Sequence, residues 1–318
     1  MAMMMVAPSF AQKMTKAEKQ AAAKLAYEAA LESINNKTWV LVPDTYALSN
    51  GDFETNIDNG NFLSCENGDC FSQGAIVCDN SYTNVSTPTI TFVKAADEDP
   101  TPAVLVCPGG GYSHLAWSHE GIETAQWFKK RGVSAFILKY RCPKQRDAAF
   151  ADAQRALSYI RANAVNFNID PTRLGVIGYS AGANLAVRLS TNHLKRGYEP
   201  LDETDRASCR PDWAMVIYPW ALIEETPKGE PPSLKLRAEF PVDKTVPPTF
   251  LVQAQDDGCK VQNALAYYAA LTRAGVKAEM HLFDKGGHGY GMRERGNPTD
   301  CWPILAEAWL SGIVENDD

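Results

Sequence analysis

A nine-residue stretch, LGVIGYSAG at residues 174–182, constrains the fold of this chain more than any other. Leu174, Val176 and Ile177 make an apolar run with two β-branched residues, which is typical of a buried strand. The residues after Ser180 repeat apolar side chains at helical spacing, so a helix follows the strand. A turn this sharp holds its central residue at strained backbone angles, and only small neighbours let the strand and the helix approach. We therefore expect Ser180 to project from the edge of a sheet, above the N-terminus of a helix.

A serine hydroxyl becomes a nucleophile near pH 7 only when a histidine acts as its base and a carboxylate orients that histidine. The chain has five histidines, and His288 is the candidate because it stands in a glycine-rich loop, GGHGYG, after an alternating strand. Another apolar strand, residues 249–252, is followed by Asp256 and Asp257, which are candidates for the orienting carboxylate. The order serine, aspartate, histidine is that of the α/β-hydrolases and differs from the orders in the chymotrypsin and subtilisin folds. Taken alone, the G-x-S-x-G pattern is equally typical of an ordinary strand-to-helix turn.

Three successive glycines, Gly109 to Gly111, follow the apolar strand that ends at Cys107. Because they lack side chains, their backbone N–H groups can point into a pocket, which suits the oxyanion of a tetrahedral intermediate. The N–H group of Ala181, the residue after the serine, would complete such an oxyanion hole. The alternative for the triplet alone is an ordinary glycine turn.

Length, charge and cysteine spacing exclude several classes of protein. The 318 residues are enough for about two domains. A net charge of −7 and the absence of a basic cluster argue against nucleic acid or an anionic membrane surface as a partner. No apolar run approaches the ~20 residues of a membrane span. Apart from Cys65 and Cys70, the cysteines are scattered without C-x-x-C or Cys/His ligand spacing, so no metal site is expected.

The N-terminal part carries no constellation with chemistry in it. Residues 1–11 are apolar and end in Ser-Phe-Ala, which resembles a cleavage site, so we expect the remnant of a secretory signal; a floppy terminus is the alternative. Residues 12–87 predict a helix and then short strands, a small α+β segment of unknown function. A signal implies a secreted or periplasmic protein, in which Cys65 and Cys70 are candidates for a disulfide.

From residue 88 to residue 318, predicted strands alternate with predicted helices, among them a long helix over residues 147–167 and a closing helix from about residue 300 to residue 313. This order is typical of one catalytic domain with a mostly parallel sheet and helices on both faces. Ligands of such sheets bind at the carboxyl ends of the strands, and every loop named above lies at such an end.

From about residue 89 onward, the chain resembles the acetyl xylan esterase-like and related carbohydrate-esterase branch of the α/β-hydrolases. The matching segments are CPGGGYSHLAWSHEG (107–121), LKYRCP (138–143), DAQRAL (152–157), GVIGYSAGANLA (175–186), FLVQAQDD (250–257) and AEMHLFDKGGHGYGM (278–292). The resemblance implies the α/β-hydrolase fold, with Ser180 as nucleophile, His288 as base and Asp256 as the orienting acid. Asp256 is preferred over Asp257 because the family's acid usually stands at the strand end, three residues before a hydrophobic residue, although residue 259 is a cysteine here.

One departure from the family pattern concerns the oxyanion hole. Lipase-like relatives carry His-Gly-Gly-Gly where this chain has Cys107, Pro108 and the glycine triplet. The departure leaves open whether Gly110 or Gly111 donates to the oxyanion beside Ala181.

The implied activity is that of a serine carboxylesterase that removes acyl groups, acetyl first among them, from an acylated plant cell-wall polysaccharide such as xylan, without a metal or organic cofactor. Tyr112, Trp117, Tyr179 and Trp220 are candidates for substrate binding because aromatic rings stack on sugars; the alternative for each is a place in the core.

The segment 220–248, rich in proline and charge, is expected to roof the pocket. Alternative functions are a feruloyl esterase, a general carboxylesterase or small-peptide hydrolase, and a non-catalytic glycan-binding protein on a hydrolase scaffold.

Overall fold

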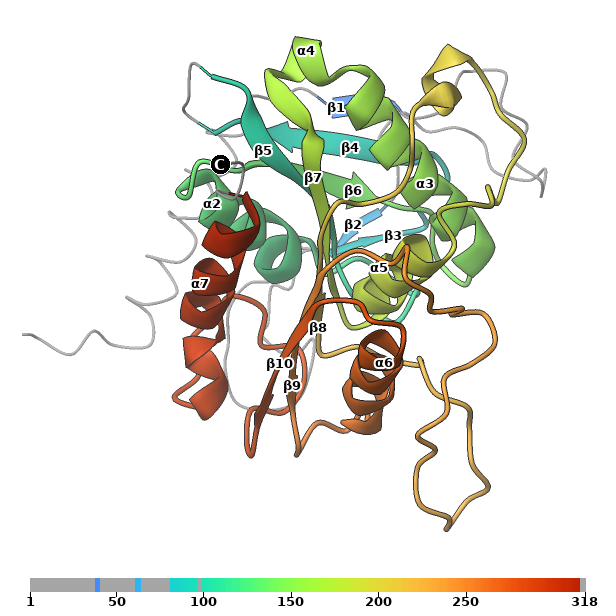
Figure 1. The fold of residues 1–318 in the computed structure, drawn as a ribbon, viewed down its shortest axis with the longest axis vertical. Coiled ribbons are helices and arrows are strands. Elements are labelled where there is room, and N and C mark those ends of the chain that lie inside the picture. The colour runs from blue at the N-terminus through green and yellow to red at the C-terminus, as the bar shows by residue number, and fades with distance from the viewer. Residues whose placement is uncertain (1–37, 41–60, 64–80, 96–98, 315–318) are drawn as a thin grey trace, which may run out of the picture.

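An eight-stranded sheet forms the centre of the computed structural model, which describes residues 38–40, 61–63, 81–95 and 99–314 (Figure 1). Its strands are β1 (Thr38–Val40), β4 (Thr89–Val93), β5 (Thr101–Cys107), β6 (Ser134–Lys139), β7 (Ile169–Tyr179), β8 (Ala214–Ile217), β9 (Thr249–Ala254) and β10 (Ala278–Phe283). They lie in the order β1-β4-β6-β5-β7-β8-β9-β10. The pairs β1–β4 and β4–β6 are antiparallel, and every other neighbouring pair is parallel.

Helices cover both faces of the sheet. Figure 1 shows α2 (Glu123–Lys129) and α7 (Trp302–Val314) on one face, and α3 (Arg146–Ala162), α5 (Ala181–Thr191) and α6 (Gln262–Arg273) on the other. Shorter helical elements are η1 (Trp117–Ile122), α4 (Ala164–Phe167), η2 (Glu203–Arg206) and η3 (Pro298–Cys301).

The side chains of β5 show how one strand serves two cores. Val104 and Val106 pack in the cluster that contains Phe128 of α2, whereas Leu105 packs in the cluster that contains Leu157 of α3. Successive residues of a strand point to opposite faces, so an unbroken apolar run is what a sheet covered on both sides requires. The predicted α/β architecture, a mostly parallel sheet with helices on both faces, is confirmed.

Two predicted helices differ in detail from what the structure shows. The helix expected over residues 147–167 is divided at Asn163 into α3 and α4. The closing helix expected from residue 300 begins as the 3₁₀ turn η3, capped by Asn297 and Asp300, before it continues as α7. Neither difference moves a loop at the carboxyl edge of the sheet.

Parts of the predicted segment 12–87 join the main body of the protein. β1 extends the large sheet, while β2 (Asn61–Leu63) and β3 (Ser81–Thr83) form a separate two-stranded sheet. The backbone of Tyr82 in β3 exchanges two hydrogen bonds with Leu115. The predicted signal remnant, the N-terminal helix and the cysteines at 65 and 70 lie outside the described residues.

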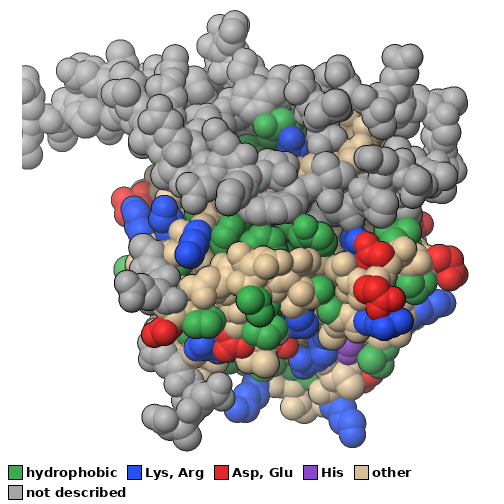
Figure 2. Space-filling model, turned by 90° about the horizontal axis from the view of Figure 1, so that it is seen from above, with side chains coloured by type: hydrophobic (Ala, Val, Ile, Leu, Met, Phe, Trp, Pro, Cys, Tyr) green, Lys and Arg blue, Asp and Glu red, His purple; other side chains and the backbone are tan. Residues whose placement is uncertain are grey.

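The surface carries charges of both signs. In the coloured part of the face that Figure 2 shows, Lys and Arg side chains are interspersed with Asp and Glu side chains. In the described part of the chain, every helix is too short or too polar to traverse a lipid bilayer.

Candidate active site

Ser180 occupies the turn between β7 and α5, at the carboxyl edge of the sheet. Its φ of 51° and ψ of −113° lie outside the regions that non-glycine residues ordinarily adopt. Such backbone strain costs on the order of 1–3 kcal/mol of stability. Glycines make the turn possible: a Cβ on Gly178 would lie 2.1 Å from the carbonyl oxygen of Gly182, and one on Gly182 would lie 2.0 Å from that of Cys107. The structure contains the predicted strand-turn-helix, and Ser180 at its turn is only 8% exposed.

His288 reaches Ser180 from the loop after β10. Its Nε2 lies 2.8 Å from Ser180 Oγ. The loop turns through Gly287 and Gly289, both with positive φ, and its backbone is held by Arg295, which donates to the carbonyl oxygens of His288 and Gly289. The ring also stands edge-on to Tyr218, with 4.9 Å between ring centroids. Two residues 108 positions apart in the sequence are therefore in hydrogen-bond contact.

The carboxylate beside His288 is that of Asp257, so the prediction of Asp256 is wrong. His288 Nδ1 lies 2.8 Å from Asp257 Oδ2 and 3.0 Å from Oδ1. Asp256 instead accepts a hydrogen bond of 2.8 Å from the backbone N–H of Gly287. Asp256 is exposed, whereas Asp257 is buried.

The turn that follows β9 accounts for this arrangement. Pairing with β10 continues to Gln255, whose N–H group donates to the carbonyl oxygen of Phe283, and the chain then bends. Asp257 faces inward, where Gln253 Nε2 and the backbone N–H of Cys259 donate to its carboxylate at 3.2 Å and 2.6 Å. These bonds hold the acid in place before any substrate binds, which is the preorganisation that such a triad needs.

The environment of His288 favours its charged form. Burial of the ring opposes that charge, but hydrogen bonds to Asp257 and Cys259 outweigh the burial and raise the pKa of His288 above its ordinary value of 6.5. In the neutral ring, a bond from Nδ1–H to the carboxylate of Asp257 leaves the lone pair of Nε2 facing Ser180. The ring is thus oriented to take a proton from that hydroxyl.

The glycine loop after β5 presents free N–H groups near Ser180. Within the part of the chain that the structure describes, the N–H groups of Gly110 and Gly111 have no hydrogen-bond acceptor. Ala181 is the first residue of α5, where helix geometry leaves the N–H without an intrahelical partner. The N–H of Gly109, by contrast, donates to Glu120 Oε2 at 2.6 Å, so Gly109 is not available to a ligand.

Glu120 is a buried carboxylate beneath these loops that sequence reasoning missed. One oxygen accepts from Gly109, and the other accepts from the hydroxyl of Tyr218 at 2.8 Å; that hydroxyl in turn accepts from the N–H of Gly291. Burial alone would raise the pKa of Glu120, but interactions with His119, Tyr218 and Gly109 outweigh it and lower the pKa below 4.5. A charged carboxylate therefore ties the glycine loop to the loop that carries His288.

Three of the four aromatic residues proposed for substrate binding lie in the core, so that prediction is wrong for them. Tyr112, Trp117 and Tyr179 are at most 3% exposed. Their polar atoms or ring edges are already used: the Tyr112 hydroxyl donates to Asn184 at 2.9 Å, and that of Tyr179 lies 2.8 Å from Thr124 Oγ1. Trp220 is only partly buried and remains a candidate for contact with substrate.

The segment 220–248 divides into two parts. Its beginning lies beside Ser180, whose carbonyl oxygen accepts from the N–H of Trp220, and Asn184 Nδ2 donates to the carbonyl oxygens of Trp220 and Ala221. Asn263 of α6 anchors the next turn by accepting from the N–H groups of Leu222 and Ile223. Two buried amides thus fix the backbone next to Ser180.

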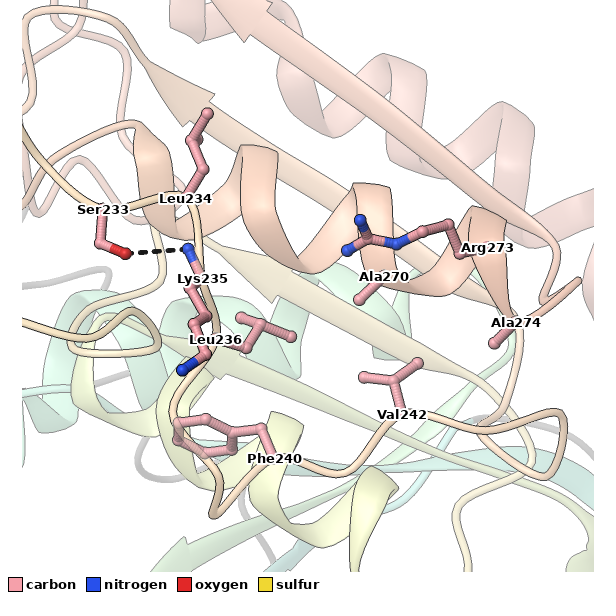
Figure 3. Close-up of a pocket in the computed structure, with 9 residues that line it drawn as sticks. All are labelled: Ser233, Leu234, Lys235, Leu236, Phe240, Val242, Ala270, Arg273 and Ala274. Carbon is pink, nitrogen blue, oxygen red and sulfur yellow. Dashed lines mark hydrogen bonds between the residues drawn. The ribbon is translucent and has the colours of Figure 1, made fainter.

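The later part of the segment runs along α6 instead of roofing the site. Figure 3 shows Ser233 to Val242 facing Ala270, Arg273 and Ala274 across a pocket of about 760 Å³. Ser180, Asp257 and His288 are not among the residues that line this pocket. The expectation that the whole segment covers the active site is therefore wrong for residues 233–242.

The chain is similar in sequence to two protein families and to several known enzymes. The BD-FAE family model matches residues 91–211, and the model of the prolyl oligopeptidase family matches residues 217–302. An acetylxylan esterase of Xylanibacter ruminicola is 29% identical over 215 residues, which are 61% of this chain and 42% of that protein. An endo-1,4-beta-xylanase B of Butyrivibrio fibrisolvens is 30% identical over 211 residues, 61% of this chain and 33% of that protein. The chain thus spans less than half the length of these two curated relatives.

Solved structures also match this chain, and the match to one of them covers nearly the whole of that protein. An acetyl ester-xyloside bifunctional hydrolase from Caldicellulosiruptor lactoaceticus has a TM-score of 0.64 and 30% sequence identity, and the match covers 80% of this chain and 97% of that one. The order of the sheet, the serine turn and this match together show that the chain belongs to the acetyl xylan esterase-like family of the α/β-hydrolases.

Proposed function

We propose that this protein is a serine carboxylesterase that removes acetyl groups from acylated xylan or its oligosaccharides. The observation that carries the proposal is the unbroken contact from Asp257 through His288 to Ser180. The choice of substrate rests on relatives described as an acetylxylan esterase and an acetyl ester-xyloside hydrolase.

Acylation begins when an ester carbonyl enters the space between Ser180 and the glycine loop. His288 Nε2 takes the hydroxyl proton as Ser180 Oγ attacks the carbonyl carbon, and Asp257 stabilises the imidazolium that forms. The oxyanion accepts hydrogen bonds from the N–H groups of Ala181 and of Gly110 or Gly111. When the intermediate collapses, the bond from the carbonyl carbon to the sugar oxygen breaks, His288 gives its proton to that oxygen, and the sugar leaves as an alcohol while the acyl group stays on Ser180.

Deacylation repeats these steps with water as the nucleophile. His288 takes a proton from the water as it attacks the acyl-enzyme, and the acid leaves when Ser180 recovers its proton.

A substrate panel tests the proposal. We expect acetate release from acetylated xylo-oligosaccharides, measured by chromatography, to exceed ferulate release from feruloylated ones at equal enzyme. Among p-nitrophenyl esters, kcat/KM should fall from acetate to octanoate, because an acyl site that selects acetyl groups would exclude long chains. Rapid cleavage of octanoate with no acetate released from xylan would contradict a carbohydrate esterase.

A peptidase is the second candidate, because the prolyl oligopeptidase family model matches residues 217–302. The same nucleophile can attack an amide, so the panel includes a prolyl p-nitroanilide. Nitroaniline release faster than acetate release from xylan would favour the peptidase.

Glu120 gives this proposal a prediction at a distance from the reacting atoms. In Glu120→Gln, an amide NH₂ replaces one acceptor oxygen, so either Gly109 or Tyr218 loses its acceptor. We expect kcat for p-nitrophenyl acetate to fall by about 10²-fold, the effect of a misplaced catalytic group. The matched control is Glu307→Gln, whose side chain is 47% exposed and pairs with Arg131; it should keep the parental kcat. Equal kcat values for the two variants would contradict the role of Glu120.

An acylated cell-wall polymer lies outside the cell that degrades it. We therefore also propose that the protein is exported and meets its polysaccharide substrate in a secreted or periplasmic form.

A further inference from the structure

We propose that Cys259 and His288 form a binding site for a thiophilic divalent cation such as Zn²⁺, whose occupation blocks the active site. Cys259 stands two residues after Asp257, in the same turn. Its Sγ lies 3.6 Å from His288 Nε2, the nitrogen that faces Ser180. The cation binding goes beyond the proposed function, and only the loss of activity rests on it.

The separation of the two donor atoms suits zinc. In tetrahedral sites zinc binds cysteine sulfur at about 2.3 Å and histidine nitrogen at about 2.0–2.1 Å, which places the two atoms about 3.5 Å apart. The observed distance of 3.6 Å therefore allows both to bind one ion without movement of the backbone. Ser180 Oγ lies 2.8 Å from the same nitrogen, so an ion bound to Nε2 would stand between His288 and the hydroxyl whose proton it takes.

Asp257 supplies the outer partner that zinc-binding histidines commonly have. It holds Nδ1 of His288 at 2.8 Å, which fixes the ring and leaves Nε2 as the ligand. Sγ of Cys259, a ring nitrogen of His288 and a carboxylate oxygen of Asp257 all lie within 4.8 Å of one another. Asp257 also accepts from the N–H of Cys259, so one carboxylate positions both proposed ligands.

Access and chemistry select the kind of ion. Cys259 and His288 are both partly exposed, so an ion can enter from solvent. Thiolate and imidazole favour Zn²⁺ over Mg²⁺ or Ca²⁺, which prefer oxygen ligands. On binding, the thiol releases its proton to solvent, and the Nε2 lone pair that would serve Ser180 is given to the metal.

Metal binding is measured first, on untagged full-length protein without any assay of activity. Zn²⁺ is titrated in competition with a chromophoric chelator, and Co²⁺ is used as a spectroscopic probe whose charge-transfer band in the near ultraviolet reports a thiolate ligand. We expect the wild type to show that band, and Cys259→Ser to lose it together with at least about tenfold in zinc affinity. Cys301→Ser, which removes an exposed cysteine outside the site, is the matched control and should keep both.

Inhibition is measured second, as the ratio of rates on p-nitrophenyl acetate with and without Zn²⁺ for each variant. Wild type and Cys301→Ser should be inhibited and should recover when EDTA is added, whereas Cys259→Ser should not be inhibited. If Cys259→Ser folds poorly, Cys259→Val replaces it in these measurements. The melting temperature of each variant without metal, compared with that of the wild type, shows whether it is folded. The proposal is overturned if the Co²⁺ band is absent from the wild type, or if Cys301→Ser loses as much affinity as Cys259→Ser. A protein that binds the metal through Cys259 but hydrolyses no ester would refute the proposed function alone.

Discussion

Replacing Ser180 by alanine is expected to lower kcat for ester hydrolysis by about 10⁶-fold, the loss seen when a triad nucleophile is removed from another serine hydrolase. The variant has no atom that can form the acyl-enzyme, and His288 Nε2 loses the hydroxyl that it contacts at 2.8 Å. The rate on p-nitrophenyl acetate measures the loss. A fluorophosphonate probe followed by mass spectrometry should label the wild type at Ser180 and leave the variant unlabelled.

Ser190→Ala is the control for this experiment. Ser190 lies in the same helix, α5, and its hydroxyl donates to the carbonyl oxygen of Ala186, so its removal perturbs the helix without touching the triad. The control should keep its labelling and a kcat within a few-fold of the parent. A wild-type protein that hydrolyses no ester and is not labelled would instead support the non-catalytic glycan-binding protein that the sequence left open.

Some parts of this site could be predicted from sequence because local rules decide them. Gly178 and Gly182 flank Ser180 because a Cβ on either would collide with backbone, and such steric demands leave a short, readable pattern. In the glycine triplet and in the loop of His288 the demand is on the backbone angle, because Gly110, Gly111, Gly287 and Gly289 adopt positive φ, which other residues rarely do. The alternation of strands and helices then brings the carboxyl ends of β5, β7, β8 and β9 to one edge of the sheet.

Other parts depend on how single side chains turn, which no local pattern encodes. Asp256 and Asp257 are neighbours, and which of them faces inward depends on the bend after Gln255. Glu120 depends on residues that are distant in the sequence. Its carboxylate accepts from the hydroxyl of Tyr218, and that hydroxyl accepts from the N–H of Gly291. The sequence around an aromatic residue does not show whether its ring is buried or exposed. The sequence therefore predicts a sugar-stacking surface from Tyr112, Trp117 and Tyr179, whereas all three lie in the core.

The pair Asp256 and Asp257 allows the sharpest test of the triad. Asp257→Asn should lower kcat by about 10⁴-fold, because the amide can donate to Nδ1 and then holds the ring in the tautomer whose Nε2 cannot accept the serine proton. Asp256→Asn removes a charge one residue away but keeps an oxygen for the N–H of Gly287, so its kcat should stay within a few-fold of wild type. Equal losses in the two variants would contradict the assignment of the acid to Asp257.

The pH dependence of the same variants separates position from charge. Hydrogen bonds to Asp257 and Cys259 raise the pKa of His288 above 6.5, and the ring must be neutral to act as a base. Activity of the wild type should therefore fall as the pH decreases through that raised pKa. Asp257→Asn removes a partner of the charged ring, so the acid limb of its weaker activity should move to lower pH, while Asp256→Asn should leave the limb in place. An acid limb that moves in Asp256→Asn and not in Asp257→Asn would mean that the outer aspartate, not the buried one, sets the charge of the base.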